Sequence, residues 1–447
     1  MKLKIDQNKQ NVIFSYLFFW EERRKTFRKN STNCNLYFAK KSIFFYLCPV
    51  LQNNSVEAFF RTHKYLVEHV NSPVKRELMR EIDWSHRLIG IKGSRGVGKT
   101  TFLLQYAKEN FGTDRSCLYI NLNHLYFTER TLVDFTDEFR IKGGKTLLID
   151  QVFKYPGWSE ELRYCYDHFP ELKIVFSGSS VMRLKEENPL LSGVADSYNL
   201  RGFSFREYLN LMAGTDFPSV KLDELLCNHT VIASEICNKV KPLAYFQDYL
   251  HHGFYPFFLE KRNFSENLIK TMNMMMEVDI LFIKQIELTY LPKVRKLLYL
   301  LAVNAPSAPN VSQLSKEIQT SRATVVNYIK YLKDARLINM LYPVDEEFPK
   351  KPAMVYMHNT NLMYPIRPAQ VEEQAVRETF FYNTLHKDNR LNKGEKNTHF
   401  LVNQKYNFKI ESENIRGRIN PDIYYTIDRT EIGRENKIPL WLFGFLY

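Results

Sequence analysis

A glycine-rich turn that ends in a lysine and a threonine has the residue types and spacing of a phosphate-binding loop. It reads GSRGVGKT, from Gly93 to Thr100, between an apolar run at residues 88–91 and a stretch with helical periodicity. Glycines allow backbone N–H groups to surround a phosphate, and the helix that follows directs its positive end toward it. The Lys99 ammonium then reaches the terminal phosphates, and the Thr100 hydroxyl holds Mg²⁺. A chance glycine-rich turn is the alternative, and the strand and helix context argues against it. The predicted nucleotide-binding residues of this loop are Gly93, Ser94, Arg95, Gly96, Val97, Gly98, Lys99, Thr100 and Thr101.

A second apolar run ends in an acidic residue whose carboxylate could help to bind the metal ion. Residues 146–150 read TLLID, so Asp150 stands at the carboxyl end of a predicted buried strand. There the carboxylate would orient Mg²⁺, whereas the alternative is a strand that merely ends in a turn. A third apolar run, residues 172–180, carries Ser177 and Ser179 at its end, and one of these hydroxyls is predicted to sense the γ-phosphate. A plain Ser/Gly turn would look the same in sequence.

Length and composition set the class of protein in which these motifs lie. The chain has 447 residues, 45% of them hydrophobic, which predicts a globular protein of about three folding units. Its formal net charge of +13 favours an acidic partner such as nucleic acid, although a solvated basic surface is the plain alternative. The six cysteines form no C-x-x-C pair, which suits a reducing cytoplasm, and no metal site is indicated beyond Mg²⁺ bound with nucleotide.

The first 55 residues differ in character from the rest. Short aromatic runs at residues 12–20 and 43–51 alternate with basic residues, and neither run has the roughly 20 apolar residues that a membrane span needs. A secretory signal would need a single apolar run and a small-residue cleavage site, and that arrangement is not evident. We expect a poorly ordered extension or a stretch that does not belong to the working protein, with a basic surface anchor as the alternative.

Four segments together resemble one family. GSRGVGKTTFLLQYAKE, LLIDQVFKYPGW, IVFSGSS and FSFREYLNL follow one another as in the AAA-superfamily P-loop ATPases of bacteria and archaea. The resemblance implies an α/β P-loop NTPase domain of the AAA/ASCE type at residues 56–215, whose parallel sheet inserts a strand between the phosphate strand and the magnesium strand. It also implies a helical lid at 216–290, a winged helix at 291–358 and a restriction-endonuclease-like α/β domain at 359–447. ATP and Mg²⁺ are the implied ligands, and assembly into a homo-oligomer is an open expectation.

The sequence departs from the pattern of this family at the positions that assist ATP hydrolysis. The family has Asp-Glu at the end of the magnesium strand, and here Asp150 is followed by Gln151, whose amide cannot accept a proton from water. An arginine pair that usually follows a serine is replaced by Gly193-Val194. Arg206 of the FSFRE segment is a tentative catalytic substitute, with an intra-domain salt bridge as the alternative role. The predicted catalytic set is therefore Lys99, Asp150, a degenerate Gln151 and tentatively Arg206, with Thr100 and Asp150 for the metal and Ser179 near the nucleotide.

The second half is predicted mainly from helical periodicity and element order. Residues 268–286 read as one helix of the lid, and residues 294–359 read as helix, helix-turn-helix and hairpin, which is the order of a winged helix. Its exposed basic residues could meet phosphates of nucleic acid, or this part could dock a protein partner. In the last part, Glu378 matches the family, but the strand expected to carry an acid-x-Lys pair reads Lys409-Ile410-Glu411. We therefore predict no nuclease activity.

The function that these residues favour is a cytoplasmic, ATP-binding AAA-type ATPase that acts as a nucleotide-dependent switch with weak hydrolysis and possible DNA contact. A degenerate scaffold whose nucleotide is structural is the alternative. A P-loop kinase for a small molecule is a further alternative, and it would need an arginine-rich lid and an acceptor base that do not stand out.

Overall fold

The computed structural model describes residues 55–182, 188–260, 263–368, 371–395, 397–412 and 420–447. Contacts divide the chain into a unit of residues 1–58 and a compact unit of residues 59–447. The extension predicted for the first 55 residues lies almost entirely outside the described residues. Within the described part of the chain, no helix is long and apolar enough to cross a membrane.

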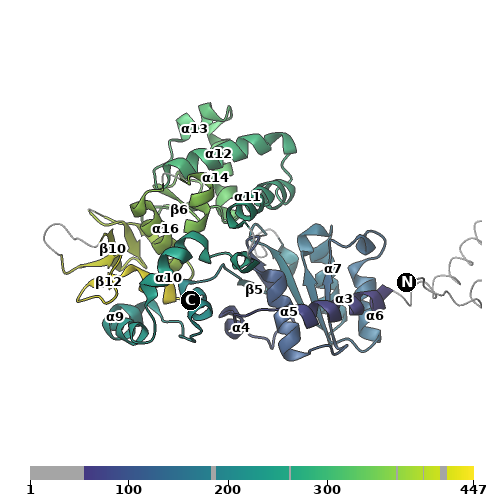
Figure 1. Cartoon of the computed structure of the whole chain (residues 1–447). Coiled ribbons are helices and arrows are strands. Elements are labelled where there is room, and N and C mark those ends of the chain that lie inside the picture. The colour runs from purple at the N-terminus through teal and green to yellow at the C-terminus, as the bar shows by residue number, and fades with distance from the viewer. Residues whose placement is uncertain (1–54, 183–187, 261–262, 369–370, 396, 413–419) are drawn as a thin grey trace, which may run out of the picture. The chain divides into compact units, whose positions relative to one another are not determined.

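A parallel sheet of five strands forms the first half of the compact unit (Figure 1). The strands are β1 (Leu88–Gly93), β2 (Cys117–Asn121), β3 (Thr146–Asp150), β4 (Lys173–Ser179) and β5 (Asp196–Asn199). Their order is β2-β3-β4-β1-β5, so β4 lies between the strand before the glycine-rich loop and the strand that ends in Asp150. The predicted insertion of a strand at this place is confirmed.

Short apolar runs produce the central strands because both faces of the sheet are covered by helices. All five residues of β3 are buried, and β2 is buried except for its last residue. The helices of this half are α3 (Ser55–His69), α4 (Leu78–Glu81), α5 (Lys99–Asn110), α6 (Leu132–Ile141) and α7 (Trp158–His168). Parallel strands end at the same edge of a sheet, so the loop, Asp150 and Ser179 meet at one edge.

A mostly helical region follows the sheet. It contains α8 (Phe205–Ala213), α9 (Leu222–Cys237), α10 (Pro242–Asp248), a π-helix (Tyr249–Gly253), α11 (Phe264–Met274) and a second π-helix (Met275–Phe282). The sequence predicts a single helix at residues 268–286, but the structure changes from α to π geometry at Met275. π-Helical segments of this kind are uncommon and are often found at functional sites.

Three helices and a two-stranded hairpin come next, in the predicted order of elements. They are α12 (Leu291–Asn304), α13 (Val311–Glu317), α14 (Arg322–Asp334), β6 (Ile338–Leu341) and β7 (Met354–Met357), followed by the short α15 (Met363–Ile366). Ser321 caps α14, because its side chain accepts a hydrogen bond from the Thr324 backbone N–H. One apolar face of α14 is buried, which leaves its polar face for solvent or a partner.

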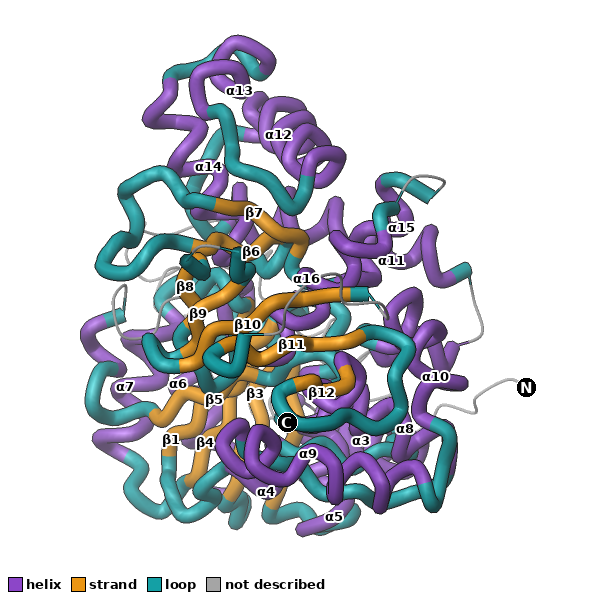
Figure 2. The backbone as a smooth tube through the Cα atoms, turned by 90° about the vertical axis from the view of Figure 1, so that its left-hand side faces the viewer, coloured by secondary structure: helices purple, strands orange, loops and turns teal. Residues whose placement is uncertain are grey.

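A second sheet of five strands closes the chain, and its strands succeed one another in Figure 2. They are β8 (Leu391–Lys393), β9 (Phe400–Val402), β10 (Tyr406–Glu411), β11 (Ile423–Ile427) and β12 (Lys437–Pro439), in the order β12-β11-β10-β9-β8. β10, β11 and β12 run parallel, whereas β8, β9 and β10 run antiparallel. Helix α16 (Glu373–Leu385) packs on this sheet through Phe381, whose ring lies 5.0 Å from that of Phe408.

The last apolar run of the sequence packs against α8 of the helical region. It forms a 3₁₀ helix, Leu440–Phe445, in which every residue is buried. The Phe205 ring of α8 lies 6.2 Å from the Phe445 ring, and the Val220 N–H donates to the Phe445 carbonyl at 2.9 Å. Helix α8 therefore belongs to a core that the final segment completes.

Candidate nucleotide-binding site

The glycine-rich loop has the backbone geometry of a phosphate cradle. Gly96 and Gly98 have φ angles of 84° and 93°, in the left-handed region that glycine adopts without a steric penalty. A Cβ atom on Gly93 would lie 2.4 Å from the Leu200 carbonyl oxygen, so only glycine fits there. The Lys99 ammonium donates to the carbonyls of Gly93 and Ser94 at 2.8 and 2.9 Å, which holds it at the mouth of the loop.

Asp150 and Thr100 come together at the place predicted for the metal ion. The Thr100 hydroxyl donates to Asp150 Oδ2 at 2.6 Å, and the Tyr119 hydroxyl donates to the same oxygen at 2.9 Å. The Ser177 hydroxyl donates to the other carboxylate oxygen. A hydroxyl and a carboxylate side by side are the hard oxygen ligands that Mg²⁺ prefers, so these residues fit the predicted ion. In a loaded site Mg²⁺ would neutralise phosphate charge, and this chain would hold it through Thr100 and Asp150.

The two serines at the end of β4 lie in different places. Ser177 is fully buried and bonds Asp150, so it orients the carboxylate and does not face the cradle. Ser179 lines the cavity beside the loop, and its hydroxyl accepts a hydrogen bond from the Val181 N–H at 3.3 Å.

Gln151 occupies the end of β3 in a constrained backbone geometry. Its φ angle is 57°, an unusual left-handed value for a residue other than glycine. Its backbone N–H donates to Asp150 Oδ1 at 3.0 Å and to Ser177 Oγ at 3.2 Å. The residue lines the cavity that contains Lys99 and Thr100, so an amide stands where the resemblance places a carboxylate.

The helical region lines one side of a cavity of about 420 Å³ beside the loop. Pro256 and Phe257 lie over the loop glycines, and Phe257 Cε1 is 3.1 Å from the position of a Cβ on Gly96. Asp279 of the second π-helix pairs with Arg95, with 3.3 Å between Asp279 Oδ2 and Arg95 Nε. A carboxylate of the helical region therefore faces the cradle directly.

The charges around Lys99 act on its proton. Burial lowers the pKa of Lys99 to about 8, although the carboxylates of Asp279 and Asp150 favour its charged form. Arg95 contributes in the same direction as burial because it is a like charge. The lysine is thus charged at neutral pH and close to losing its proton in mildly alkaline solution.

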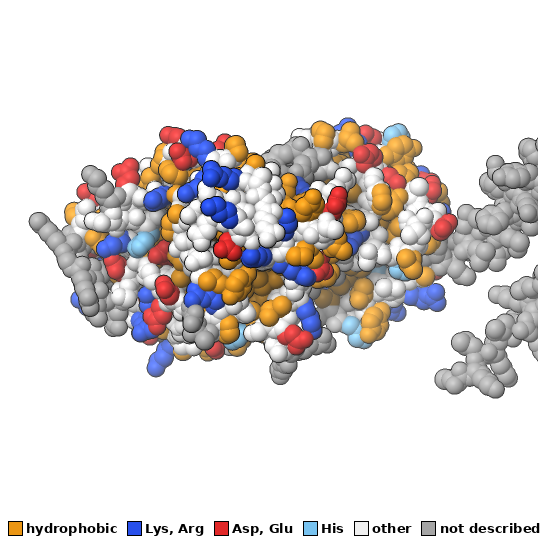
Figure 3. Space-filling view, turned by 90° about the horizontal axis from the view of Figure 1, so that it is seen from above, with side chains coloured by type: hydrophobic (Ala, Val, Ile, Leu, Met, Phe, Trp, Pro, Cys, Tyr) orange, Lys and Arg blue, Asp and Glu red, His pale blue; other side chains and the backbone are white. Residues whose placement is uncertain are grey.

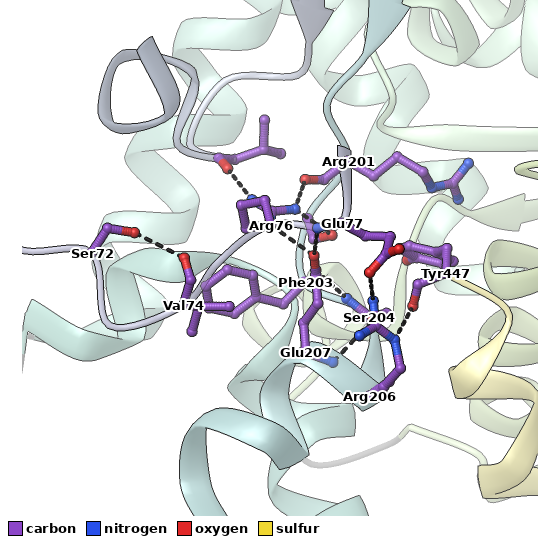
Figure 4. A network of polar contacts seen from close by, with 12 residues as sticks. Ser72, Val74, Arg76, Glu77, Arg201, Phe203, Ser204, Arg206, Glu207 and Tyr447 are labelled. Atoms are coloured by element: carbon purple, nitrogen blue, oxygen red, sulfur yellow. Dashed lines mark hydrogen bonds and ion pairs between the residues drawn. The ribbon is translucent and has the colours of Figure 1, made fainter. Parts of the chain in front are cut away.

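The guanidinium of Arg206, the tentative catalytic residue, forms hydrogen bonds with residues outside the cavity (Figure 4). It donates to Glu77 Oε2 at 3.0 Å and to the Phe217 and Tyr447 carbonyls, each at 3.1 Å. It is not among the described residues that line the cavity. Its ion pair with Glu77 is a salt bridge within the first half of the chain, which is the alternative to a catalytic role.

Arg76 is a site residue that the sequence does not reveal. Figure 4 shows its guanidinium between the loop and α8. It donates to the Val97 carbonyl at 3.1 Å, to Glu207 Oε1 at 3.2 Å and to the Arg201 carbonyl at 2.6 Å. Neither Arg76 nor Asp279 belongs to a motif, and no local pattern signals them, because their partners lie far away in the sequence.

Glu378 and the Lys409-Ile410-Glu411 segment do not form one site. The Glu378 carboxylate accepts hydrogen bonds from the Tyr356 hydroxyl at 3.2 Å and from Gln374 Nε2 at 3.0 Å. Lys409 and Glu411 pair with each other at 2.6 Å. Helix α16 covers the face of β10 that carries Phe408 and Ile410, so Lys409 and Glu411 point to the other face. Among the described residues there is no group of three or more His, Cys, Asp or Glu side chains that could hold a metal ion.

Comparison with known proteins supports the assignment of the first half. Residues 85–209 match the model of a family described as an AAA domain, and residues 243–360 match a domain of unknown function. The uncharacterized protein MJ1637 of Methanocaldococcus jannaschii is 29% identical over 271 residues, and the match spans 57% of each chain. The AAA-domain match and the strand order together give this region the fold of an AAA-type P-loop NTPase.

Solved structures resemble the chain only in part. A RuvB variant of Thermotoga maritima has 12% identity and a TM-score of 0.25, with 64% of this chain and 89% of that chain covered. The nucleotide-analogue-bound DnaA of Aquifex aeolicus has 16% identity and a TM-score of 0.24, with 61% and 86% covered.

Proposed function

We propose that this chain is an ATP-binding AAA-type ATPase that acts as a nucleotide-dependent switch and hydrolyses ATP slowly. The observation that carries the proposal is Gln151, which lines the cavity at the end of β3 beside an otherwise complete cradle. Binding needs the loop, Lys99, Thr100 and Asp150, and these residues meet in one place. Hydrolysis also needs a base to take the proton of the attacking water.

Apart from Asp150, the described residues that line the cavity include two carboxylates, those of Glu260 and Asp279, and Asp279 is paired with Arg95. General-base assistance contributes about 10²–10⁴-fold to a rate, and a glutamine amide cannot supply it. The arginines that line the cavity in the described part of the chain are Arg76 and Arg95. Arg76 is bonded to Val97 and Glu207, and Arg95 is paired with Asp279. Neither guanidinium is available for a γ-phosphate unless these contacts change.

The test compares the full-length chain with Gln151→Glu. We expect both to bind ATP-Mg²⁺ with similar affinity, and we expect steady-state turnover to rise by about 10²-fold in the variant. Gln151→Ala is the matched control, because it changes the side chain without adding a base. Equal turnover of the wild type and Gln151→Glu, at equal affinity, would contradict the proposal.

Nucleic-acid contact through α12–α14 and the β6–β7 hairpin is the second part of the proposal. In Figure 3, Lys and Arg side chains gather over the region of these helices. Arg322 and Asn327 of α14 are exposed, and Lys330 is partly exposed with its ammonium 4.3 Å from the centre of the Phe348 ring. Basic side chains on the open face of such a helix can meet phosphates, and the binding would weaken with salt.

Measuring DNA affinity in the ATP-bound and the ADP-bound state distinguishes a switch from a scaffold. A switch binds duplex DNA with different affinity in ATP and in ADP, whereas a scaffold with structural nucleotide binds its partner equally in both. Fluorescence anisotropy of a labelled duplex, with Arg322→Gln as the test and Arg61→Gln as a matched exposed control, separates these outcomes. Light scattering with each nucleotide tests in the same samples whether the chain assembles into a homo-oligomer.

A further inference from the structure

Basic side chains from three separate segments converge outside the nucleotide cavity. Arg201 follows β5, Arg336 follows α14, and His386 is the C-cap residue of α16. A chain of hydrogen bonds links the three segments. Arg201 Nη2 donates to the Asn383 carbonyl at 2.6 Å, and Asn383 Nδ2 donates to the His358 carbonyl at 2.8 Å. The His358 backbone N–H in turn donates to the Leu337 carbonyl at 3.0 Å. Arg336 precedes Leu337, and His386 lies one turn beyond Asn383 on the same helix.

The Arg201 guanidinium bonds the Asn383 carbonyl through Nη2 and lies 5.2 Å from the centre of the Tyr447 ring, and it keeps one donor unused. Arg201 Nε is buried without a partner. Across the described ranges of the chain, the Arg336 guanidinium and the His386 ring nitrogens have no hydrogen-bond or ion-pair partner. Figure 4 shows that the Arg201 guanidinium points away from the Arg76 contacts, to which this residue contributes only its backbone carbonyl.

The local charge is positive and poorly balanced. Asp334 is the carboxylate close to Arg336, and it lies 3.9 Å from the Lys333 ammonium. Burial and the Arg201 charge lower the pKa of Arg336 to about 10, and burial with Arg201, Arg336 and Lys333 lowers the pKa of His386 to about 3. The three residues are partly exposed, and cations held this close together in a protein are normally paired, since an unpaired one is costly to desolvate.

We propose that Arg201, Arg336 and His386 form a binding site for a small phosphate-class anion, either free phosphate or a phosphate monoester. Guanidinium groups match the tetrahedral oxygens of phosphate with paired N–H donors, and two of them from different segments can bind one anion together. The burial of Arg201 Nε favours a small anion over a nucleic-acid backbone. The site is separate from the phosphate loop, because none of its three residues lines the nucleotide cavity.

The experiment measures phosphate binding to the full-length chain in a Lys99→Ala background, which removes the main phosphate ligand of the loop. Inorganic phosphate is titrated by calorimetry at constant ionic strength into that chain and into versions that add Arg336→Gln or Arg390→Gln. Arg390 is exposed and lies close to His386 in sequence, so it is the matched control. We expect Arg336→Gln to weaken phosphate binding about tenfold or more, as the loss of a charge-assisted hydrogen bond implies, and Arg390→Gln to leave it unchanged.

Two further readouts separate a ligand site from a purely structural arginine. Without phosphate, Arg336→Gln should melt at a higher temperature than the parent, because it removes like-charge repulsion, and saturating phosphate should reverse this order. Bound phosphate should also raise the pKa of His386, measured by NMR titration of its ring, since an anion favours the imidazolium. Unchanged phosphate affinity in Arg336→Gln, or an equal loss of melting temperature with and without phosphate, would overturn the proposal. Binding of a mixed-sequence oligonucleotide without binding of inorganic phosphate would also overturn it.

Discussion

The Arg76 guanidinium donates a hydrogen bond to the Val97 carbonyl inside the phosphate loop, over 3.1 Å. Glu207 holds the same guanidinium from the side of α8, and the Glu207 side chain also accepts from the Ser204 N–H in the capping box of that helix. Arg76 is 7% exposed, so these are contacts in a low-dielectric interior where hydrogen bonds to charged groups are strong. The loop is thus fixed from a helix outside its own strand-loop-helix unit.

Replacing Arg76 should loosen the loop and weaken nucleotide binding. We expect Arg76→Lys, which keeps the charge but loses the fork of N–H donors, to raise the Kd for ADP-Mg²⁺ about tenfold. Arg80→Lys is the matched control, because Arg80 lies four residues away and is mostly exposed. Calorimetry gives the affinities, and melting curves show whether the fold survives. An unchanged Kd in Arg76→Lys would mean that the Val97 contact does not position the loop.

Removing the charge of Asp279 should strengthen nucleotide binding. This carboxylate faces the cradle and pairs with Arg95, so it opposes the negative charge of incoming phosphates. We expect Asp279→Asn to lower the Kd for ATP about five- to tenfold, which corresponds to roughly 1 kcal/mol. Glu277→Gln in the same π-helix controls for a general change of charge. Weaker binding in Asp279→Asn would show instead that the carboxylate helps to hold the nucleotide or its metal ion.

Nucleotide affinity should fall in alkaline solution because of Lys99. Its pKa in the free protein is lowered to about 8 by burial, and phosphate binding requires the charged form. The affinity should therefore be constant below pH 8 and decline above it, by up to about tenfold for each pH unit. Lys99→Arg, whose guanidinium stays charged, should remove this dependence. A flat profile up to pH 10 in the wild type would contradict the role of the Lys99 proton.

Acid should destabilise the fold through His63. This side chain is 1% exposed, its Nδ1 accepts from the Tyr119 N–H at 3.0 Å, and burial lowers its pKa to about 4. Since the unfolded state binds the proton first, the free energy of unfolding is unaffected above pH 6.5 and falls between pH 6.5 and 4, by roughly 2 to 3 kcal/mol. Urea unfolding of His63→Gln should show a shallower fall than the wild type. The control is His168→Gln, an exposed histidine; a slope unaltered by the His63 change would refute the assignment.

The parts of the site that lie within short segments were predictable from the sequence. The glycine spacing and the periodicity of the flanking residues predicted the phosphate cradle, and the apolar run before Asp150 predicted its strand. Both predictions were possible because backbone geometry and burial are determined over a few residues. The predicted place of β4 beside β1 is confirmed as well. β5 was not anticipated, since its sequence DSYN carries no apolar pattern and it lies at the edge of the sheet.

The parts that depend on distant pairs could not be predicted in this way. Asp279 meets Arg95 across 184 residues and Arg76 meets Glu207 across 131, and a single sequence does not record such pairings. The change to π geometry at Met275 was also missed, because the apolar spacing of that stretch fits an ordinary helix equally well. The domain boundaries, the winged helix and the nuclease-like domain remain predictions.

The contact between Arg206 and the Tyr447 carbonyl joins residues 241 positions apart, and its consequence concerns synthesis on the ribosome. Helix α8 emerges about midway through translation, yet part of its core comes from the 3₁₀ helix Leu440–Phe445. Until that segment leaves the exit tunnel, the apolar face around Phe205 is covered only in part, by Phe246 and Tyr249. Such long-range closure slows folding and prolongs exposure of apolar surface. Nascent chains that stall before residue 440 should therefore depend on chaperones more than the finished protein does.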